Sequence, residues 1–89
     1  MKKIGIYPGT FDPITAGHMD IILRASKVLD KLYVGVAVDS MKDPLFSQEE
    51  RVEMIQQELI ANNIKEDLVE VEDFSGLLVN FAKQRSASI

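Results

Sequence analysis

The sequence predicts an α/β fold, more specifically the N-terminal half of a doubly wound, Rossmann-like parallel sheet. Apolar strand-like runs alternate with helical segments in the order β-α-β-α-β-α-(β) over the 89 residues. Residues 32–38 are apolar on both alternating faces, as expected of a strand that is covered on both sides. Alternation of this kind implies right-handed crossovers between parallel strands, with helices flanking the sheet.

The first strand and the first helix are expected on either side of a long loop. Residues 3–7 are short and β-branched and are closed by Pro8, which indicates a strand. From His18 the apolar spacing becomes helical and predicts a helix. Its expected inner face is made of Ile21, Ile22, Ala25, Val28, Leu29 and Leu32.

A second helix is expected after the strand at residues 32–38. Ser47 and Glu50 form a capping box, and this predicts a helix that runs to about residue 60. Asn62 and Asn63 end it. The side chains expected to face inward are Val52, Ile55, Leu59 and Ile60.

The C-terminal part predicts a third strand at residues 68–71 and then a third helix. Asp73 or Ser75 is the expected cap of this helix, and Leu77, Leu78, Phe81 and Ala82 are its expected apolar residues. Residues 86–89 are typical of the first residues of a fourth strand. We therefore expect residues 1–89 to be one incomplete domain, ending where strand four begins, with the sheet order 3-2-1-4.

Composition and charge exclude several classes of protein. A net charge of −4 argues against nucleic acid or an anionic membrane as a partner. The sequence has no cysteine, so it can form neither disulfides nor thiolate metal sites. No apolar run approaches the roughly 18 residues of a membrane span. We expect a cytoplasmic protein.

The loop between the first strand and the first helix has the composition of a phosphate site. Gly9 allows close approach of the backbone, Thr10 and Thr15 offer hydroxyl groups, and Gly17 and His18 stand where the helix begins. Neither G-x-G-x-x-G nor G-x-x-x-x-G-K-[ST] occurs, which disfavours hydride-transferring enzymes and P-loop ATPases. Taken alone, Thr15 to His18 favours a purely structural role, since so short a motif often occurs by chance.

The longer pattern resembles a known family. "YPGTFDPITAGH", "FSQEERVEMI" and "FSGLLVNFAKQ" resemble the corresponding stretches of the phosphopantetheine adenylyltransferases, in the nucleotidyltransferase superfamily marked by [H/T]-x-G-H. The resemblance spans essentially the whole chain. It implies transfer of adenylyl from ATP to 4′-phosphopantetheine, which gives dephospho-coenzyme A and pyrophosphate in coenzyme A biosynthesis, with Mg²⁺. It also implies a homohexamer.

The resemblance implies roles for individual residues. Thr10, Phe11, Gly17 and His18 are expected to bind ATP, with Thr10 also contacting the substrate phosphate and His18 stabilising the transition state. Lys42 is expected to bind the phosphopantetheine phosphate and the developing charge, although alone it would be interpreted as a surface lysine.

The third helix is expected to supply Leu78 to the pantetheine arm, although Leu78 judged alone is a core residue. No protein ligand to the metal is expected. Arg24 and Arg51 are expected on the surface or in helix pairing. The acidic residues near the third strand are expected to form a solvated rim: Glu66, Asp67, Glu70, Glu72 and Asp73.

Two alternatives stay open beside the transferase prediction. One is a nucleotidyltransferase with another acceptor, such as a cytidylyltransferase, although those more often carry His in place of Thr15. The other is a non-catalytic nucleotide-binding or assembly module. The resemblance implies that further site residues follow residue 89, so we expect the 89-residue chain alone to be inactive.

Overall fold

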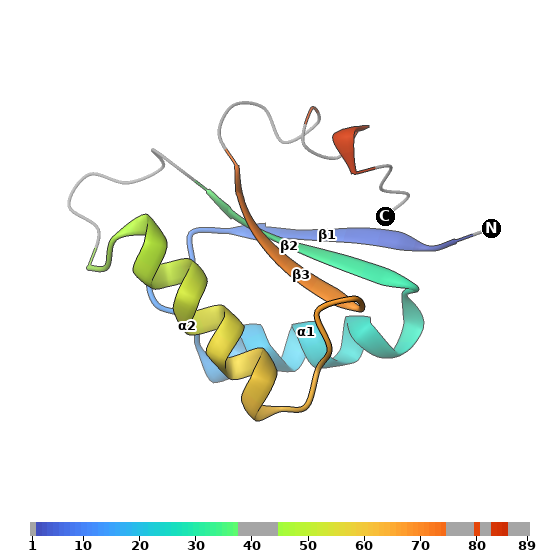
Figure 1. Ribbon diagram of the computed structural model, residues 1–89, viewed down its shortest axis with the longest axis horizontal. Coiled ribbons are helices and arrows are strands. Elements are labelled where there is room, and N and C mark those ends of the chain that lie inside the picture. Colours follow the sequence, from blue (N-terminus) through green and yellow to red (C-terminus); the bar gives the residue numbers. More distant parts are fainter. Residues whose placement is uncertain (1, 38–44, 75–79, 81–82, 86–89) are drawn as a thin grey trace.

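The computed structural model describes residues 2–37, 45–74, 80 and 83–85. These residues form β1 (Ile4–Gly9), α1 (Ala16–Val28), β2 (Lys31–Ala37), α2 (Gln48–Ala61) and β3 (Val69–Phe74) (Figure 1). The alternation confirms the predicted α/β class. The predicted fourth strand and most of the predicted third helix lie outside the described residues, although residues 80, 83 and 84 are helical.

The three strands form one parallel sheet in the order β1-β2-β3. Ile4 of β1 lies beside Lys31 of β2, and Leu32 of β2 lies beside Val69 of β3. This order matches the predicted arrangement 3-2-1, with β2 in the centre. The carboxyl ends of parallel strands share one edge of the sheet, so β1 and β2 end side by side, with Gly9 beside Val36.

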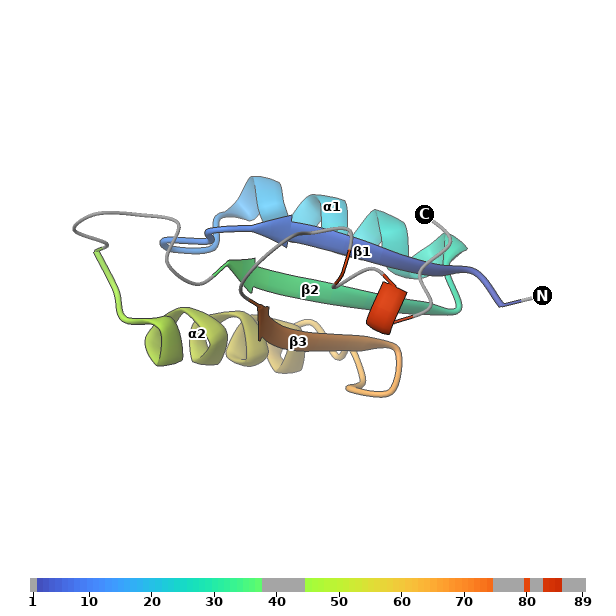
Figure 2. The ribbon, with the colours of Figure 1, turned by 90° about the horizontal axis from the view of Figure 1, so that it is seen from above.

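Both helices cover the same face of the sheet, α1 toward β1 and α2 toward β3 (Figures 1 and 2). This follows from two right-handed crossovers that move in the same direction along the sheet. Alternate side chains of β2 point toward the helices and form the core with them. The buried apolar residues are Phe11, Met19, Ile22, Leu32, Val34, Val36, Ile55, Leu59 and Val69.

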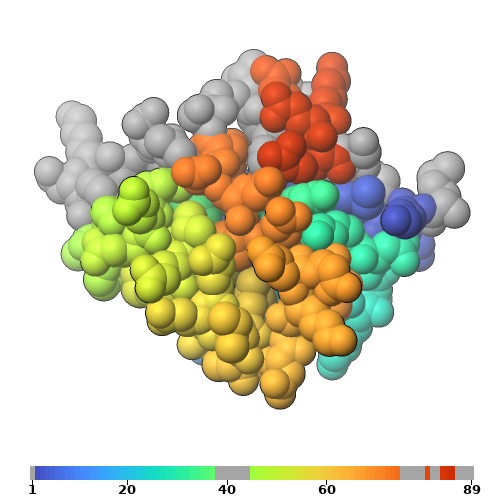
Figure 3. All heavy atoms as spheres, viewed as in Figure 1, coloured from blue at the N-terminus to red at the C-terminus, as the bar shows by residue number. Residues whose placement is uncertain are grey.

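The opposite face of the sheet carries polar side chains and the described part of the C-terminal segment. Tyr33 of β2 lies beside Glu70 of β3. Arg85 donates a hydrogen bond to Glu72, and its guanidinium carbon lies 5.7 Å from the centroid of the Tyr33 ring. Residues 80 and 83–85 thus lie away from α1 and α2 (Figures 1 and 3), as a doubly wound sheet requires after its third strand.

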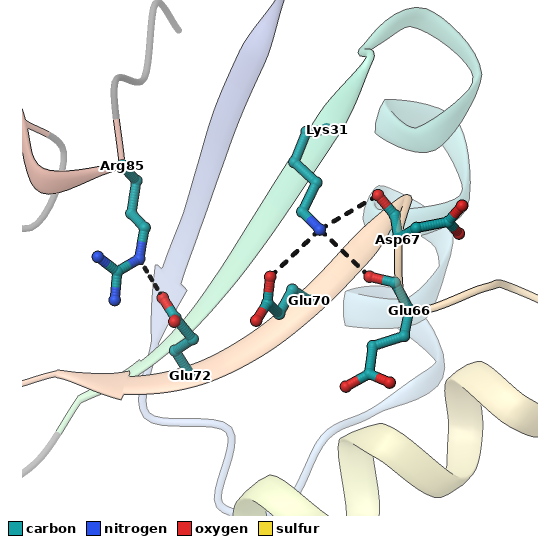
Figure 4. Close-up of polar contacts among 6 residues, drawn as sticks. All are labelled: Lys31, Glu66, Asp67, Glu70, Glu72 and Arg85. Atoms are coloured by element: carbon teal, nitrogen blue, oxygen red, sulfur yellow. Dashed lines mark hydrogen bonds and ion pairs between the residues drawn. The ribbon is translucent and has the colours of Figure 1, made fainter.

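The acidic residues around β3 are more engaged than expected. Lys31 Nζ lies 3.2 Å from the Glu70 carboxylate, and it donates to the main-chain carbonyls of Glu66 and Asp67 at 3.2 and 3.1 Å (Figure 4). The prediction of a solvated rim is wrong for the half-buried Glu70 and Glu72, because the sheet brings both against cations. It is confirmed for the exposed residues: Glu66, Asp67 and Asp73.

Three of the side chains that were predicted to face inward point to solvent instead. Ile21 is 49% exposed, Val28 68% and Ile60 73%. Successive residues of an α-helix are separated by about 100° around its axis. Ile21 and Ile60 therefore turn away from the sheet, because their neighbours Ile22 and Leu59 are the ones that pack into the core.

Element ends differ from the sequence pattern by a few residues. β1 continues through Pro8, which is tolerated because β1 lies at an edge of the described sheet. β3 extends to Phe74, so Asp73 belongs to a strand and does not cap a helix. Ser75 lies outside the described residues. The first helix starts at Ala16, two residues before the predicted start.

The predicted start and end of α2 are confirmed. The Ser47 hydroxyl accepts from the Glu50 backbone N–H at 3.1 Å, and the Glu50 carboxylate accepts from the Ser47 backbone N–H at 2.9 Å. Asn62 is the C-cap residue. The pairing expected for Arg24 is also present, with Asp20 at 3.1 Å on the exposed face of α1. Within the described residues, neither helix has the length and apolar character needed to cross a membrane.

Candidate functional site at the start of the first helix

A reciprocal capping box fixes the imidazole of His18 at the N-terminus of α1. The Thr15 hydroxyl accepts from the His18 backbone N–H at 3.3 Å, and His18 Nδ1 accepts from the Thr15 backbone N–H at 3.0 Å. A ring nitrogen that accepts a hydrogen bond carries no proton, so the proton of the neutral ring is on Nε2. The box therefore leaves an Nε2–H donor for a ligand.

Aromatic side chains also pack against the imidazole of His18. The centroids of the Phe11 and His18 rings are 4.9 Å apart in an edge-to-face arrangement, and Tyr7 packs on Phe11 at 5.3 Å. Burial raises the pKa of the Tyr7 phenol above its ordinary value. Phe11 as a whole residue is only 2% exposed. Its ring belongs to the core, and the residue offers a ligand little accessible surface.

The loop that carries Phe11 has an unusual backbone. Phe11 has φ 48°, a left-handed conformation that non-glycine residues rarely adopt, and the peptide between Asp12 and Pro13 is cis. Thr10 follows the last residue of β1 and is half-buried. The fold thus brings Thr10, Phe11 and His18 together at the carboxyl end of β1.

Gly17 lies in the exposed first turn of α1. A Cβ built on Gly17 would meet only the Thr15 hydroxyl oxygen, at 3.7 Å, which is an ordinary contact. Packing within the described residues therefore does not require a glycine here. The first backbone amides of a helix have no acceptor within it, so those of Ala16 and Gly17 are available to a ligand.

The charge at this end of α1 favours an anion. The first turn, all of which is described, contains no acidic residue. The aligned peptide dipoles place a partial positive charge at this end. Together with the Nε2–H of His18, the free amides make a site that can bind a phosphate and stabilise developing negative charge on it.

Arg51 is a buried residue beside the candidate site that the sequence analysis did not single out. The expected surface position is wrong, because Arg51 is only 5% exposed, whereas the expected pairing within its helix is present with Gln48. It donates to the carbonyl oxygen of Thr10 at 2.9 Å, to that of Ala37 at 3.5 Å and to the side chain of Gln48 at 2.6 Å. Helical spacing could have indicated this, since Arg51 precedes the buried Ile55 by one turn.

Asp12 is a second residue that was not singled out. Its carboxylate accepts from the backbone N–H groups of Leu45 and Phe46, at 2.6 and 2.8 Å. The loop after β1 is thereby connected to the segment that leads into α2. Lys42 and Leu78, two of the predicted site residues, lie outside the described residues.

Other features of the described residues do not resemble a phosphate site. No group of three His, Asp or Glu side chains among them is arranged to hold a metal ion. A hollow of about 770 Å³ lies between α2 and β3, but its lining is mostly acidic and would repel phosphates. None of the site residues that the structure describes, Thr10, Phe11, Gly17 and His18, lines it.

Comparison with known proteins places these features in a family. The model of the Cytidylyltransferase-like family matches residues 6–89. The chain is 53% identical over 88 residues to a phosphopantetheine adenylyltransferase of Rhodospirillum centenum, covering 99% of this chain and 48% of the relative. It is 56% identical over 84 residues to that of Helicobacter acinonychis, covering 94% of this chain and 51% of the relative. The chain thus spans about half the length of these relatives.

Solved structures show the same fold. A bifunctional NMN adenylyltransferase/ADP ribose pyrophosphatase from Francisella tularensis, complexed with AMP and a Mn ion, matches with a TM-score of 0.73 and 25% identity. The match covers 94% of this chain and 25% of that chain. A lipopolysaccharide core biosynthesis protein from Thermoplasma volcanium matches with a TM-score of 0.70 and 22% identity, covering 98% of this chain and 70% of that chain.

Proposed function

Because the chain belongs to the cytidylyltransferase-like family, we propose that it supplies the N-terminal part of a phosphopantetheine adenylyltransferase site. The observation that carries this proposal is the capping box at the start of α1, which leaves the Nε2–H of His18 available beside a helix end without acidic residues. The relatives at 53% and 56% identity favour 4′-phosphopantetheine as the acceptor.

The reaction requires positioning and neutralisation of charge. A phosphate oxygen of 4′-phosphopantetheine attacks the α-phosphorus of ATP, the bond from that phosphorus to the β-phosphate bridge breaks, and pyrophosphate leaves. The attacking oxygen is already anionic, so no general base is needed. Catalysis of this kind depends on orienting two phosphates and on stabilising the charge that develops between them.

His18 is proposed to donate its Nε2–H to the α-phosphate as the charge develops. The amides of Ala16 and Gly17 and the main chain of Phe11 would bind further phosphate oxygens, and the Thr10 hydroxyl would contact the attacking phosphate. These roles agree with the anion-favouring charge at the start of α1.

The family resemblance adds three further parts to the proposed site: Lys42, Leu78 and Mg²⁺. Lys42 would bind the phosphate of phosphopantetheine, and Leu78 would line the pantetheine arm. Mg²⁺ would arrive with ATP, coordinated by the oxygens of the triphosphate. We also propose the cytoplasmic homohexamer that the resemblance implies.

The proposal is tested in a chimera, since the chain covers 48% of the Rhodospirillum centenum relative. In the chimera, residues 1–89 are continued by the C-terminal half of that relative. With ATP, Mg²⁺ and 4′-phosphopantetheine, the chimera is expected to form dephospho-coenzyme A and pyrophosphate in equal amounts. The 89-residue chain alone is expected to form little or none.

Two results would contradict the proposal. One is a folded chimera that forms no product. The other is a chimera that adenylylates nicotinamide mononucleotide in preference to phosphopantetheine, an acceptor suggested by the Francisella tularensis structure. Sedimentation of the active chimera measures its assembly, and a monomer would exclude the homohexamer.

A further inference from the structure

We infer that Arg51 is a positioning residue for the phosphate site, acting through the peptide group between Thr10 and Phe11. The inference rests on the function proposed above. Arg51 extends from the start of α2 to the loop after β1, where its guanidinium donates to the Thr10 carbonyl at 2.9 Å. It therefore reaches, from a different helix, the loop that approaches His18.

The bond from Arg51 determines the direction of one particular donor. The peptide between Thr10 and Phe11 is trans, since the cis peptide of this loop is the one between Asp12 and Pro13. The carbonyl and the N–H of a trans peptide point in opposite directions. When Arg51 holds the Thr10 carbonyl, the Phe11 N–H must point away from the guanidinium.

The Phe11 N–H is the donor that this arrangement leaves for a ligand. Among the described residues it has no hydrogen-bond partner. The Phe11 side chain is fixed in the core, and its φ of 48° is unusual. The main chain at this point is thus held from both sides, by the buried ring and by Arg51, and the Phe11 N–H is the donor of this peptide that the described residues leave unpaired.

The charge of Arg51 supports the same role. Its side chain is 5% exposed, and within the described residues its partners are two carbonyl oxygens and an amide oxygen, none of them a carboxylate. Its Nε has no partner there. A buried cation that lacks a counter-ion is unfavourable, and an anion bound at the neighbouring loop would compensate it.

Inorganic pyrophosphate, titrated into the 89-residue chain and followed through backbone amide chemical shifts, tests the inference. The Phe11 amide is expected to shift in the unmodified chain. Arg51→Met should weaken pyrophosphate binding about 10- to 100-fold and suppress the Phe11 shift. Its thermal midpoint is measured alongside and should fall somewhat, because the substitution removes the donor to the Thr10 and Ala37 carbonyls.

Arg24→Met is the matched control, since it removes the same charge from the exposed face of α1. It should leave the affinity and the Phe11 shift unchanged. Arg51→Lys keeps the charge but lacks the planar fork that holds two acceptors, so its affinity should fall between those of the other two chains.

Several outcomes would overturn the inference. These are unaltered binding in Arg51→Met, equal losses in Arg51→Met and Arg24→Met, or a Phe11 amide that pyrophosphate does not perturb. Should Arg51→Met fail to fold, Arg51→Lys decides: unchanged affinity overturns the inference, and weaker affinity at an unchanged midpoint supports it. An inactive chimera whose pyrophosphate affinity still depends on Arg51 would refute the proposed reaction but not the positioning role.

Discussion

Helices α1 and α2 begin with the same hydrogen-bonded motif but differ in charge. At α1 the box is formed by Thr15 and His18, and at α2 by Ser47 and Glu50. The reciprocal bonds are alike, with the third side chain accepting from the cap backbone N–H at 3.0 Å in α1 and at 2.9 Å in α2. Only the side chain at the third helical position differs in kind.

The difference shows how one capping motif can serve two purposes. The first turn of α2 carries Glu49 and Glu50, whose charges compensate the helix dipole from within the chain. The first turn of α1 has no acidic residue, and its imidazole completes the box without negative charge. The positive end of α2 is thus compensated by acidic side chains of its own first turn, whereas the first turn of α1 contains none.

The largest effect is expected from His18→Glu, which gives the capping box of α1 the same acidic side chain that Glu50 supplies in α2. Glutamate is the usual partner in a capping box, so the helix start should persist and the thermal midpoint should change little. The donor to the α-phosphate is lost and a repelling carboxylate takes its place. We expect kcat of the chimera to fall by at least about 10²- to 10³-fold, measured as formation of dephospho-coenzyme A.

Ser47→Ala provides the control for that substitution, because it removes the α2 cap and leaves the α1 site intact. Loss of such a cap costs about 1 kcal/mol, so this variant should melt earlier with unchanged activity per folded molecule. If His18→Glu instead melts many degrees lower while its folded fraction keeps its activity, His18 is a structural cap only.

A smaller effect is expected from Gly17→Ala. The added methyl group would meet only the Thr15 hydroxyl at 3.7 Å, and alanine favours helix by up to about 1 kcal/mol over glycine. The thermal midpoint should therefore be equal or higher. Pyrophosphate binding, measured by calorimetry, should weaken about tenfold because the methyl group obstructs the approach of phosphate to the backbone. Unchanged affinity would show that the ligand does not approach Gly17.

The smallest expected effect is on the pH dependence of α2. The backbone N–H and the hydroxyl of Ser47 lower the pKa of the Glu50 carboxyl below its ordinary value of 4.5. A carboxyl whose pKa is lower in the folded state adds stability above its unfolded pKa, and that stability is lost as the pH falls through the folded value. In Glu50→Gln, the thermal midpoint should therefore depend less on pH below about 4.5. Parallel curves for the two chains would contradict this.

Much of the fold was predictable because its signals are local. The α2 capping box joins residues that are three positions apart. The alternation of strands and helices is likewise indicated by local hydrophobic spacing, without knowledge of any tertiary contact. Thr10, Phe11, Gly17 and His18 lie within nine consecutive positions of one loop and helix start. Their proximity therefore followed from the sequence.

The predictions that were wrong concern contacts between elements, which no local sequence pattern contains. Ile21 and Ile60 have apolar side chains and helical spacing, but the sheet lies on the other side of each helix. Glu70 and Glu72 are typical of a solvated strand, yet Lys31 and Arg85 reach them from other parts of the chain. Orientation between elements decides such contacts.

The sequence by itself determined the order of the described elements, the start of α2 and the loop that carries the imidazole. Only the tertiary structure determined which distant residues contact that loop. Arg51 reaches Thr10 across 41 positions of sequence, and Asp12 reaches Phe46 across 34. The physical reason is that a parallel sheet brings the carboxyl ends of successive strands to one edge. Residues that are remote along the chain become neighbours there, and a buried arginine can hold the peptide beside the proposed phosphate site.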